Sequence, residues 1–291
     1  MNEPPFSVII PAHNEAAVIG RCLSKLLEGA SAEALPEVII AANGCSDETV
    51  AIAREVAPFA TVLDLPAGSK VIAMNEGNRL AEAVPRFFLD ADILCSYASL
   101  AATARVLRRP GVMAASPELR MDLSKCDQWV KSYYKVWLTQ PYVRDRLVGS
   151  GVYGLSAEGL SKIGEIPATF ADDTWVRTRF SYDQRRNVSY DEDGNSVYFT
   201  VSPPRTASDL VKIEARRRVG SEQVALLGWG ADGEQKRLNS FSDLRTARAE
   251  GASVVDLGTY LTLKATALVK YRWRKLRGKA PVWTRDLAAR S

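Results

Sequence analysis

The sequence predicts an α/β protein with a mostly parallel sheet flanked by helices and a basic helical extension at the C-terminal end. Two observations support this prediction. Over the first 110 residues, short β-branched and apolar runs alternate with stretches whose apolar residues recur at helical spacing. A polar loop also follows each apolar run, which is typical of βα units in a parallel sheet with helices on both faces.

Four buried strands are expected in this part of the chain. Each is an apolar run, rich in β-branched or aromatic residues, that ends at a polar or turn-forming segment. Pro11 is expected to end the first strand because proline has no N–H to donate to a strand ladder. Helices are expected after the first three strands, at 18–27, after Ser46-Asp47 and at 71–83. The strands are placed at 6–10, 37–42, 61–65 and 86–89.

The polar loops that follow these strands are expected to lie close together. The carboxyl ends of neighbouring parallel strands meet at one edge of a sheet, where open α/β sheets bind their ligands. Topology alone therefore brings four polar segments to one edge: His13-Asn14-Glu15, Asn43-Gly44, Gly68-Ser69-Lys70 and Asp90-Ala91-Asp92.

Asp90 and Asp92 follow the apolar run 87–89 and are separated only by Ala91. Residues i and i+2 of an extended segment point the same way, so the two carboxylates are expected to project together. Paired like charges repel unless a cation lies between them. Mg²⁺ is commonly held by one or two carboxylates while substrate phosphates complete its coordination. Taken alone, the pattern fits a divalent metal site and a simple turn after a strand equally well.

Composition argues against several classes of protein. A net charge of +4 over 291 residues does not indicate a nucleic-acid-binding protein. The four cysteines have no C-x-x-C spacing, so neither a zinc site nor a disulfide framework is expected, and a reducing cytoplasm fits best. Neither a secretory leader nor a transmembrane helix is expected. No G-x-G-x-x-G follows the first strand, and the chain has no P-loop signature, which disfavours a dinucleotide oxidoreductase and a P-loop ATPase.

The four loops, in this order and spacing, resemble the nucleotide-sugar-binding half of family 2 glycosyltransferases with the GT-A fold. The resemblance rests on the segments 8–15, 42–47, 68–70 with Asn75, and 90–92. Each motif alone is weak evidence for the family, but four motifs in the same order and spacing are strong evidence. The resemblance implies a Rossmann-like GT-A sheet and an inverting, non-processive hexosyltransferase of bacterial type. Such an enzyme uses a nucleotide-diphospho-sugar donor in glycan or polysaccharide biosynthesis.

The resemblance also assigns a metal site. Asp90-Ala91-Asp92 matches the DXD motif of the family, in which the acids act through a divalent cation on the donor diphosphate. Asp92 and Asp90 are therefore the expected ligands of Mn²⁺ or Mg²⁺. The motif as a whole, including Ala91, is expected to contact the nucleotide-sugar.

Five further residues are assigned to the nucleotide-sugar by the resemblance. Pro11, His13 and Glu15 match the first nucleotide-contacting loop. Lys70 matches a basic residue near the base and the phosphates. Asn43 departs from the commoner D-D-G-S pattern, but its amide can hydrogen-bond a uracil edge, so a UDP-sugar is the expected donor. Singly, such residues are also explained as a loop histidine, an acid at a helix start or a solvated lysine.

The segment Gly149-Ser150-Gly151 interrupts the apolar stretch 147–155. Turns flanked by glycine allow the backbone to approach a ligand closely. In the family, a comparable glycine-containing loop lies near the donor sugar and the acceptor. The resemblance therefore adds these three residues to the expected nucleotide-sugar site.

Asp172-Asp173 forms a second acidic site with apolar neighbours on both sides. An inverting transfer is a single in-line displacement, so the acceptor hydroxyl needs one carboxylate base on the face opposite the leaving diphosphate. The pair resembles the acid-Asp pair of the family, whose second residue is the base. Asp173 is thus the expected base and Asp172 a neighbour that positions it or raises its pKa. Either residue could also serve as a helix N-cap.

A basic helix is expected to begin at Lys212. Arginines suit a departing diphosphate because they bind its oxygens in pairs. Arg216 and Arg218 are therefore candidate diphosphate contacts, and a solvated cationic face explains them equally well. The chain lacks the Q-x-x-R-W signature of processive synthases, which favours addition of one sugar per encounter.

Aromatic residues and a basic tail mark the rest of the chain. The helix expected at 129–138 carries Tyr133, Tyr134 and Trp137, which fit a core more readily than a sugar platform. The segment 257–279 mixes apolar and aromatic residues with Lys and Arg. It fits an interfacial anchor on anionic lipid and a helix docked on the catalytic domain or a second subunit equally well. An anchor would place the protein at the inner face of the cell membrane, with a saccharide or lipid-linked acceptor.

We expect a GT-A catalytic domain at 1–228, with a nucleotide-sugar-binding half at 1–110 and an acceptor-binding half at 111–228, followed by the extension at 229–291. Two alternatives to a glycosyltransferase stay open. A sugar-phosphate nucleotidyltransferase would normally show a first loop rich in glycine and basic residues, which this chain lacks. A non-catalytic nucleotide-sugar-binding module is the other. Nucleic acid is not an expected partner because the acidic pairs would repel its phosphates.

Overall fold

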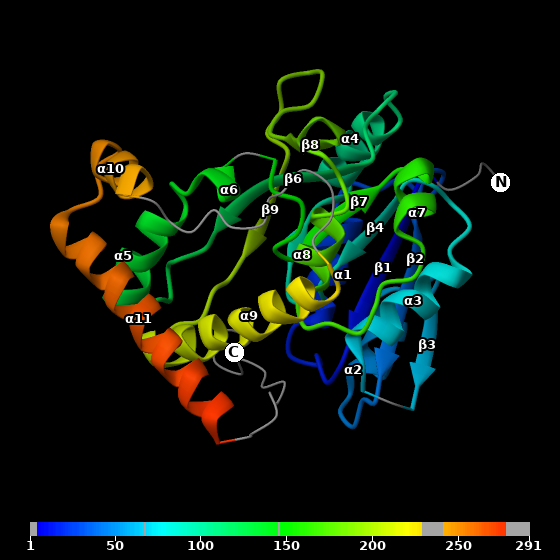
Figure 1. The fold of residues 1–291 in the computed structure, drawn as a ribbon. Coiled ribbons are helices and arrows are strands. Elements are labelled where there is room, and N and C mark those ends of the chain that lie inside the picture. Colours follow the sequence, from blue (N-terminus) through cyan, green and yellow to red (C-terminus); the bar gives the residue numbers. More distant parts are fainter. Residues whose placement is uncertain (1–4, 67, 145, 229–240, 278–291) are drawn as a thin grey trace. The chain divides into compact units, whose positions relative to one another are not determined.

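The computed structural model describes residues 5–66, 68–144, 146–228 and 241–277 (Figure 1). The chain divides into two compact units. The first comprises Met1–Arg120, Arg146–Ala168 and Arg179–Val201, and the second comprises Met121–Asp145, Thr169–Thr178 and Ser202–Ser291.

The first unit is built on a sheet whose described strands follow the order β3-β2-β1-β4-β7-β6-β9-β5, with β8 paired to β6 outside this path. β1, β2, β3 and β4 are parallel, whereas β7 runs antiparallel to both β4 and β6. The predicted mostly parallel sheet flanked by helices is confirmed. The strands are β1 (Ser7–Ala12), β2 (Glu37–Asn43), β3 (Thr61–Leu65), β4 (Arg86–Leu89), β5 (Leu94–Cys95), β6 (Ala114–Met121), β7 (Val152–Leu155), β8 (Arg185–Val188) and β9 (Tyr198–Val201).

Helices cover both faces of the central strands, as the complete burial of β1 requires. Val8 and Ile10 belong to one core cluster with residues of α1 (Ile19–Leu27), α2 (Thr49–Val56) and α4 (Tyr97–Leu107). Ile9 points to the other face and meets α3 (Lys70–Leu80) at Gly77. The unit also contains α7 (Ala157–Ile163) and the short 3₁₀ helix η1 (Tyr182–Gln184).

Pro11 does not end the first strand. β1 continues to Ala12, and Pro11 is buried opposite Ala41 of β2. The pairing of β1 with β4 stops at Ile9, so no partner strand on that side requires an N–H from Pro11. The proline is therefore accommodated inside a central strand because its neighbour is shorter.

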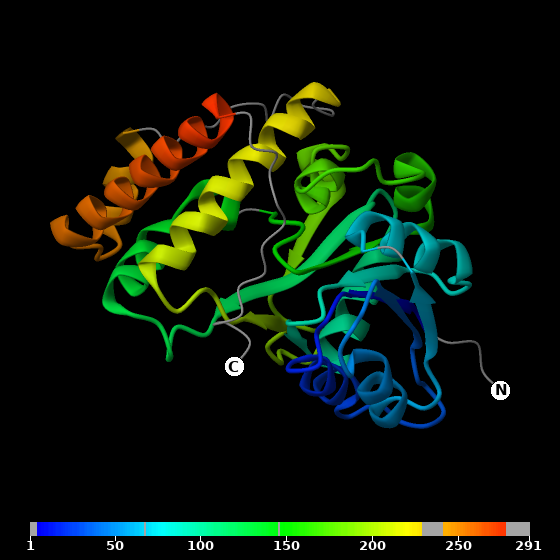
Figure 2. The same cartoon turned by 90° about the horizontal axis from the view of Figure 1, so that it is seen from below.

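The second unit is helical in its described part. α11 packs along α5 and α9, and the three helices lie side by side in both views (Figures 1 and 2). Residues 241–277 therefore share a unit with 121–145, which differs from the separate extension expected at 229–291. Positions 229–240 and 278–291 of that expected extension lie outside the described residues. Its helices are α5 (Gln128–Trp137), α6 (Pro141–Arg144), α8 (Asp172–Arg177), α9 (Ala207–Leu226), α10 (Phe241–Ala249) and α11 (Val254–Leu276).

The aromatic residues of α5 form the core of this unit. Tyr133 and Tyr134 are almost fully buried, with ring centroids 5.2 Å apart, and Trp137 packs edge-on against Tyr134. Tyr260 of α11 lies 5.0 Å from the Tyr133 ring. These aromatics are core residues, so the alternative of a sugar platform is not supported. Within the described parts of the chain, none of the helices is long and apolar enough to cross a bilayer.

Two helical glycines allow a matched test of how closely α3 packs on the sheet. A Cβ added to Gly77 would lie 2.6 Å from Ile9 Cγ2, whereas one added to Gly258 of α11 would have no described atom within 4 Å. We expect Gly77→Ala to lower the free energy of unfolding by about 1–3 kcal/mol through overpacking. Gly258→Ala should raise it by about 1 kcal/mol, because alanine favours a helix. Urea unfolding measures both, and equal effects would contradict the close packing.

Candidate active site

Loops that follow the four parallel strands meet at one edge of the first unit, as topology predicts. His13 Nδ1 lies 2.5 Å from the backbone oxygen of Asn43, which joins the loop after β1 to the end of β2. A Cβ on Gly68 would lie 3.3 Å from His13 Cε1, so the loop after β3 approaches the same imidazole. Lys70 Nζ lies 2.8 Å from Asp90 Oδ1, which links that loop to the segment after β4.

The first two loops are held together by hydrogen bonds between their polar residues. The backbone N–H of Glu15 donates to Thr49 Oγ1 at 2.6 Å, and the backbone N–H of Ser46 donates to Asn14 Oδ1 at 2.6 Å. Asp47 Oδ1 accepts from the backbone N–H of Thr49 at 3.1 Å, close to the start of α2. Glu15 is itself only 5% exposed, so it is not a solvated acid.

Asn43 has a structural contact that the sequence did not indicate. Its Nδ2 donates to the carbonyl oxygens of Ala12 at 2.8 Å and Ala41 at 3.3 Å, and the residue is only 2% exposed. The Nδ2 group is therefore used inside the chain, and the contact between this amide and a base edge stays a prediction. The amide connects the ends of β1 and β2, because a buried N–H group must find an acceptor.

Lys70 is the first residue of α3, and its position follows from the helix start. Ser69 is the N-cap, and its hydroxyl accepts from the backbone N–H of Ile72. The ion pair between Lys70 and Asp90 is partly open to solvent, since the two side chains are 33% and 38% exposed. Such pairs contribute little to stability, about 0–1 kcal/mol. A ligand can therefore exchange with this contact without a large loss of folding energy.

Asp90-Ala91-Asp92 forms a tight turn rather than an extended strand end. β4 stops at Leu89, and the backbone N–H of Ile93 donates to the carbonyl oxygen of Asp90 at 3.1 Å. Ala91 is buried while both aspartates are partly exposed. The expectation that both acids project together from an extended segment is thus corrected. A turn, with its small central residue inward, leaves both carboxylates accessible.

The glycine segment lies against this turn. The backbone N–H of Asp90 donates to the carbonyl oxygen of Gly151 at 2.8 Å. Gly149, Ser150 and Gly151 all have positive φ, at 126°, 61° and 118°. A Cβ on Gly151 would lie 2.5 Å from Ile93 Cδ1, so only glycine fits here. The structure therefore brings Gly149-Ser150-Gly151 beside the Asp90 turn, although they are about 60 positions apart in the sequence.

The charges of Asp90 and Asp92 affect the pKa of a buried neighbour, Cys22. Cys22 is fully buried in α1, and its Sγ lies 3.9 Å from the carbonyl oxygen of Asp90. Burial raises the pKa of the Cys22 thiol far above its ordinary value, and the charges of Asp92, Cys95 and Asp90 add to this effect. Cys22 is therefore a neutral packing residue beneath the turn.

The donor set of this turn fits a magnesium-like ion. Among the described residues, no cluster of three or more His, Cys, Asp or Glu side chains could hold a metal ion by itself. Mg²⁺ and related ions are often bound by one or two carboxylates, with the remaining positions filled by phosphates and water. Asp90 and Asp92 match this pattern because they are accessible and follow a buried strand.

Asp172 and Asp173 lie in the second unit, in the first turn of α8. The N-cap position is occupied by Ala171, without a side-chain cap bond, so neither aspartate is the cap. Asp172 is 5% exposed, whereas Asp173 is only partly buried. Asp173 Oδ1 accepts from the backbone N–H of Thr174 at 2.6 Å. Asp173 is therefore the more accessible acid of the pair.

α9 determines where α8 begins. Gln223 Oε1 accepts from the backbone N–H of Phe170 at 2.9 Å, just ahead of the acid pair. A Cβ on Gly220 would lie 2.7 Å from Ala171 Cβ, so the two backbones approach closely at this glycine. These contacts position Asp172 and Asp173, and the sequence pattern alone did not indicate them.

An ion cluster around one buried carboxylate joins α9 to α11. Glu214 is 3% exposed and pairs with Arg217 Nη1 at 2.8 Å and with Lys264 Nζ at 2.6 Å. Burial alone would raise the pKa of Glu214, but the charges of Arg217 and Lys264 outweigh it and lower the pKa to about 2. The candidate Arg218 donates from Nη2 to the carbonyl oxygen of Lys264 at 3.4 Å, and Arg216 is partly exposed. Sequence analysis missed this cluster because it depends on a pairing between distant helices.

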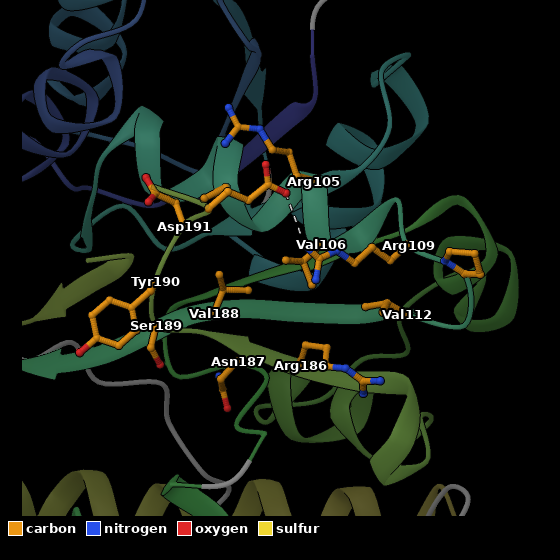
Figure 3. Close-up of a pocket in the computed structure, with 13 residues that line it drawn as sticks. Arg105, Val106, Arg109, Val112, Arg186, Asn187, Val188, Ser189, Tyr190 and Asp191 are labelled. Carbon is orange, nitrogen blue, oxygen red and sulfur yellow. Dashed lines mark hydrogen bonds and ion pairs between the residues drawn. The ribbon is translucent and has the colours of Figure 1, made fainter. Parts of the chain in front are cut away.

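The first unit also has a pocket of about 620 Å³ between the C-terminal half of α4 and the segment that begins with β8 (Figure 3). Arg109 pairs with Glu192 at 3.5 Å across it, and Arg186 donates to backbone oxygens. None of the site residues predicted from sequence lines this pocket.

Glu214→Gln should destabilise the protein by about 3 kcal/mol at pH 7, because it leaves two cations without their carboxylate. The folded pKa of Glu214 lies below its ordinary value of 4.5, so the stabilisation is present above pH 4.5 and is lost as the pH falls through about 2. Urea unfolding should therefore show that the difference between wild type and variant shrinks on acidification.

Glu222→Gln is the matched control for this variant, because Glu222 lies on the same helix but pairs with Lys275 at the surface. The control should lose less than about 1 kcal/mol. Equal losses in the two variants would contradict the account of a buried cluster.

Comparison with solved structures identifies similar folds. The mannosyltransferase PcManGT from Pyrobaculum calidifontis, in complex with GDP-Man and Mn²⁺, aligns with a TM-score of 0.65 and 19% identity, covering 94% of this chain and 89% of that one. Glucosyl-3-phosphoglycerate synthase from Mycobacterium tuberculosis, in complex with Mn²⁺, UDP and glucosyl-3-phosphoglycerate, aligns with a TM-score of 0.54 and 18% identity, covering 78% and 81%. The same enzyme in complex with Mg²⁺ and UDP aligns with the same TM-score. These likenesses show a shared GT-A fold.

Sequence comparison gives the family. No curated protein matches the chain. The sequence model of glycosyl transferase family 2 matches residues 7–154, slightly more than half of the 291 residues. The match runs from β1 to β7 and includes all four polar loops and the glycine segment. The chain belongs to glycosyl transferase family 2.

Proposed function

We propose that this protein is an inverting, non-processive glycosyltransferase that transfers a sugar from a nucleotide-diphospho-sugar to a saccharide or lipid-linked acceptor in glycan or polysaccharide biosynthesis. The observation that carries the proposal is the cluster of four loops joined by the His13–Asn43 and Lys70–Asp90 contacts. Membership of a glycosyltransferase family favours this function over a sugar-phosphate nucleotidyltransferase and over a non-catalytic binding module.

On the donor side, Asp92 and Asp90 would hold a divalent cation, Mn²⁺ or Mg²⁺. Both aligned enzymes were solved with such an ion. When bound, the cation would neutralise charge on the leaving diphosphate. Because Asp90 already pairs with Lys70, we assign the direct metal contact to Asp92 and a supporting contact to Asp90. Lys70 supplies a second positive charge beside the diphosphate.

The loops around this turn would bind the rest of the donor. We assign the nucleoside to the loop from Pro11 to Glu15, with His13 as its accessible polar side chain. Gly149-Ser150-Gly151 would let the donor sugar approach the backbone. A UDP-sugar is the proposed donor, and GDP-sugars belong in the same test because the Asn43 Nδ2 group donates to backbone carbonyls.

Asp173 is the proposed base. In an inverting transfer, the acceptor oxygen attacks the anomeric carbon, the bond from that carbon to the diphosphate breaks, and the acceptor proton passes to a carboxylate. Support comes from the partial exposure of Asp173 beside the buried Asp172, which would hold it in place. Arg216 and Arg218 are proposed contacts for the leaving diphosphate. The basic C-terminal segment suggests an acceptor at the inner, cytoplasmic face of the cell membrane.

A donor panel tests the function. UDP- and GDP-sugars are incubated with the protein and Mn²⁺ or Mg²⁺, and release of nucleoside diphosphate is followed together with the melting temperature. We expect at least one donor to stabilise the protein in a metal-dependent manner and to be hydrolysed slowly. Release of pyrophosphate instead would indicate a nucleotidyltransferase. No stabilisation by any nucleoside diphosphate or its sugar would contradict the proposal.

Asp92→Asn should remove most of the metal-dependent stabilisation by the donor, because an amide is a weaker ligand for a hard cation than a carboxylate. Melting curves with and without Mn²⁺ measure this effect. The matched control is Asp64→Asn, at an exposed position of β3, which should retain the full donor response. An unchanged response in Asp92→Asn would remove Asp92 from the metal site.

Asp173→Asn should lower the transfer rate by about 10²–10⁴-fold, the usual contribution of a general base, while donor binding stays intact. The control is Asp209→Asn, since Asp209 is likewise an acid in the first turn of a helix, α9. If both variants lose only stability, and by similar amounts, Asp173 serves the helix start rather than the reaction.

A further inference from the structure

α11 has one face that is used inside the second unit. Tyr260, Leu263 and Ala267 are buried against α5 and α9. Polar contacts fix the same face, because Lys264 pairs with Glu214 at 2.6 Å and Asp256 pairs with Lys135 at 3.2 Å. Docking on α5 and α9 therefore explains the residues on one face of α11. It does not explain the apolar residues on the opposite face.

The opposite face, which we call the exposed stripe, is uncharged over most of its length. The first charged residue at a fully exposed position of α11 is Arg272. Large apolar side chains on the stripe are open to solvent, at 67% for Val269, 53% for Trp273 and 86% for Leu276. Patches of this kind mark a binding surface. The stripe consists of Val254, Val255, Gly258, Leu261, Thr262, Ala265, Thr266, Val269, Trp273 and Leu276.

α9 also ends with exposed apolar residues. Glu222 of α9 accepts a hydrogen bond from the Tyr271 hydroxyl at 2.5 Å and pairs with Lys275, which connects the C-terminal half of α9 to α11. Leu226 and Leu227 follow on α9 and are 84% and 45% exposed.

Positive charge accompanies these apolar residues. No acidic residue occurs between Leu257 and Arg277, all of which the structure describes. The Arg277 guanidinium lies 3.6 Å from the centroid of the Trp273 ring. Tryptophan and arginine with this arrangement suit a boundary between acyl chains and headgroups. The basic residues beside the exposed end are Lys270, Arg272, Arg274, Lys275 and Arg277.

We propose that the exposed stripe of α11 lies on the surface of a membrane that contains anionic phospholipids. Apolar side chains would enter the acyl boundary, while the cations would contact lipid phosphates. A second copy of the chain fits less well, because residues 257–277 contain no acidic side chain that could pair with the basic end of the partner's helix. The inference deepens the proposed function, which places the acceptor at a membrane, and it assigns a defined face to that contact.

Vesicle flotation of the full chain tests this proposal. Vesicles of phosphatidylcholine alone are compared with vesicles that also contain phosphatidylglycerol, without donor or metal. We expect binding to the anionic vesicles that weakens as salt rises, because surface charges are screened over about 10 Å at 0.1 M. Absent binding, or equal binding to neutral vesicles, would overturn the proposal. Neither outcome depends on donor binding, so the proposed function is judged separately.

The double variant Val269→Glu with Trp273→Glu should weaken vesicle binding by about tenfold or more, since it removes two apolar contacts and adds negative charge. Phe59→Glu is the control, because Phe59 is 45% exposed in the first unit and should not affect binding. Melting temperature and donor response must be unchanged in both variants. If light scattering shows a dimer that the double variant dissociates, and flotation is negative, the stripe joins two copies and the proposal fails.

Discussion

The parallel pairing of β1 with β2 and β4 is the constraint on which the candidate donor site depends. This pairing places the carboxyl ends of the three strands at one edge of the sheet, so the loops that follow them lie close together. The contacts of His13 with Asn43 and of Lys70 with Asp90 then hold those loops in place. The antiparallel strand β7 brings a further segment to this edge. Gly151, which directly precedes β7, accepts a hydrogen bond from the backbone N–H of Asp90. The strand pairing that forms the sheet therefore also places the candidate ligand-binding residues at this edge.

The second unit shows a different way of positioning an acid. Asp173 lies on a short helix, and α9 sets the start of that helix through Gly220 and Gln223. α9 is itself tied to α11 by the buried carboxylate of Glu214. A charge cluster that takes no part in the reaction thus supports the residue proposed to act as base. Burial makes this support strong, because breaking a buried ion pair costs far more than breaking a surface one.

The sequence allowed the strands and helices of the first 90 residues to be predicted in order, because hydrophobic periodicity and loop polarity are local. It also predicted which loops would meet, since parallel topology follows from alternating elements. Other features depend on contacts between distant segments and could not be predicted. The Asn43 amide turns toward Ala12, Pro11 is tolerated because β4 is short, and Glu214 finds Lys264 on a helix 50 residues away. A helix was one expectation for the segment 257–279, but the sequence did not show which of its faces packs against α5 and α9.

The central claim is that the loops after β1 to β4, with the glycine segment, bind the nucleotide-sugar. Hydrogen–deuterium exchange of the full chain with and without a nucleoside diphosphate and Mn²⁺ tests it most directly. The account predicts slower amide exchange in segments 11–15, 43–49, 68–72, 90–93 and 149–152, with little change in α10 and along the exposed stripe of α11. Protection confined to α11, or to the pocket beside α4, would contradict it.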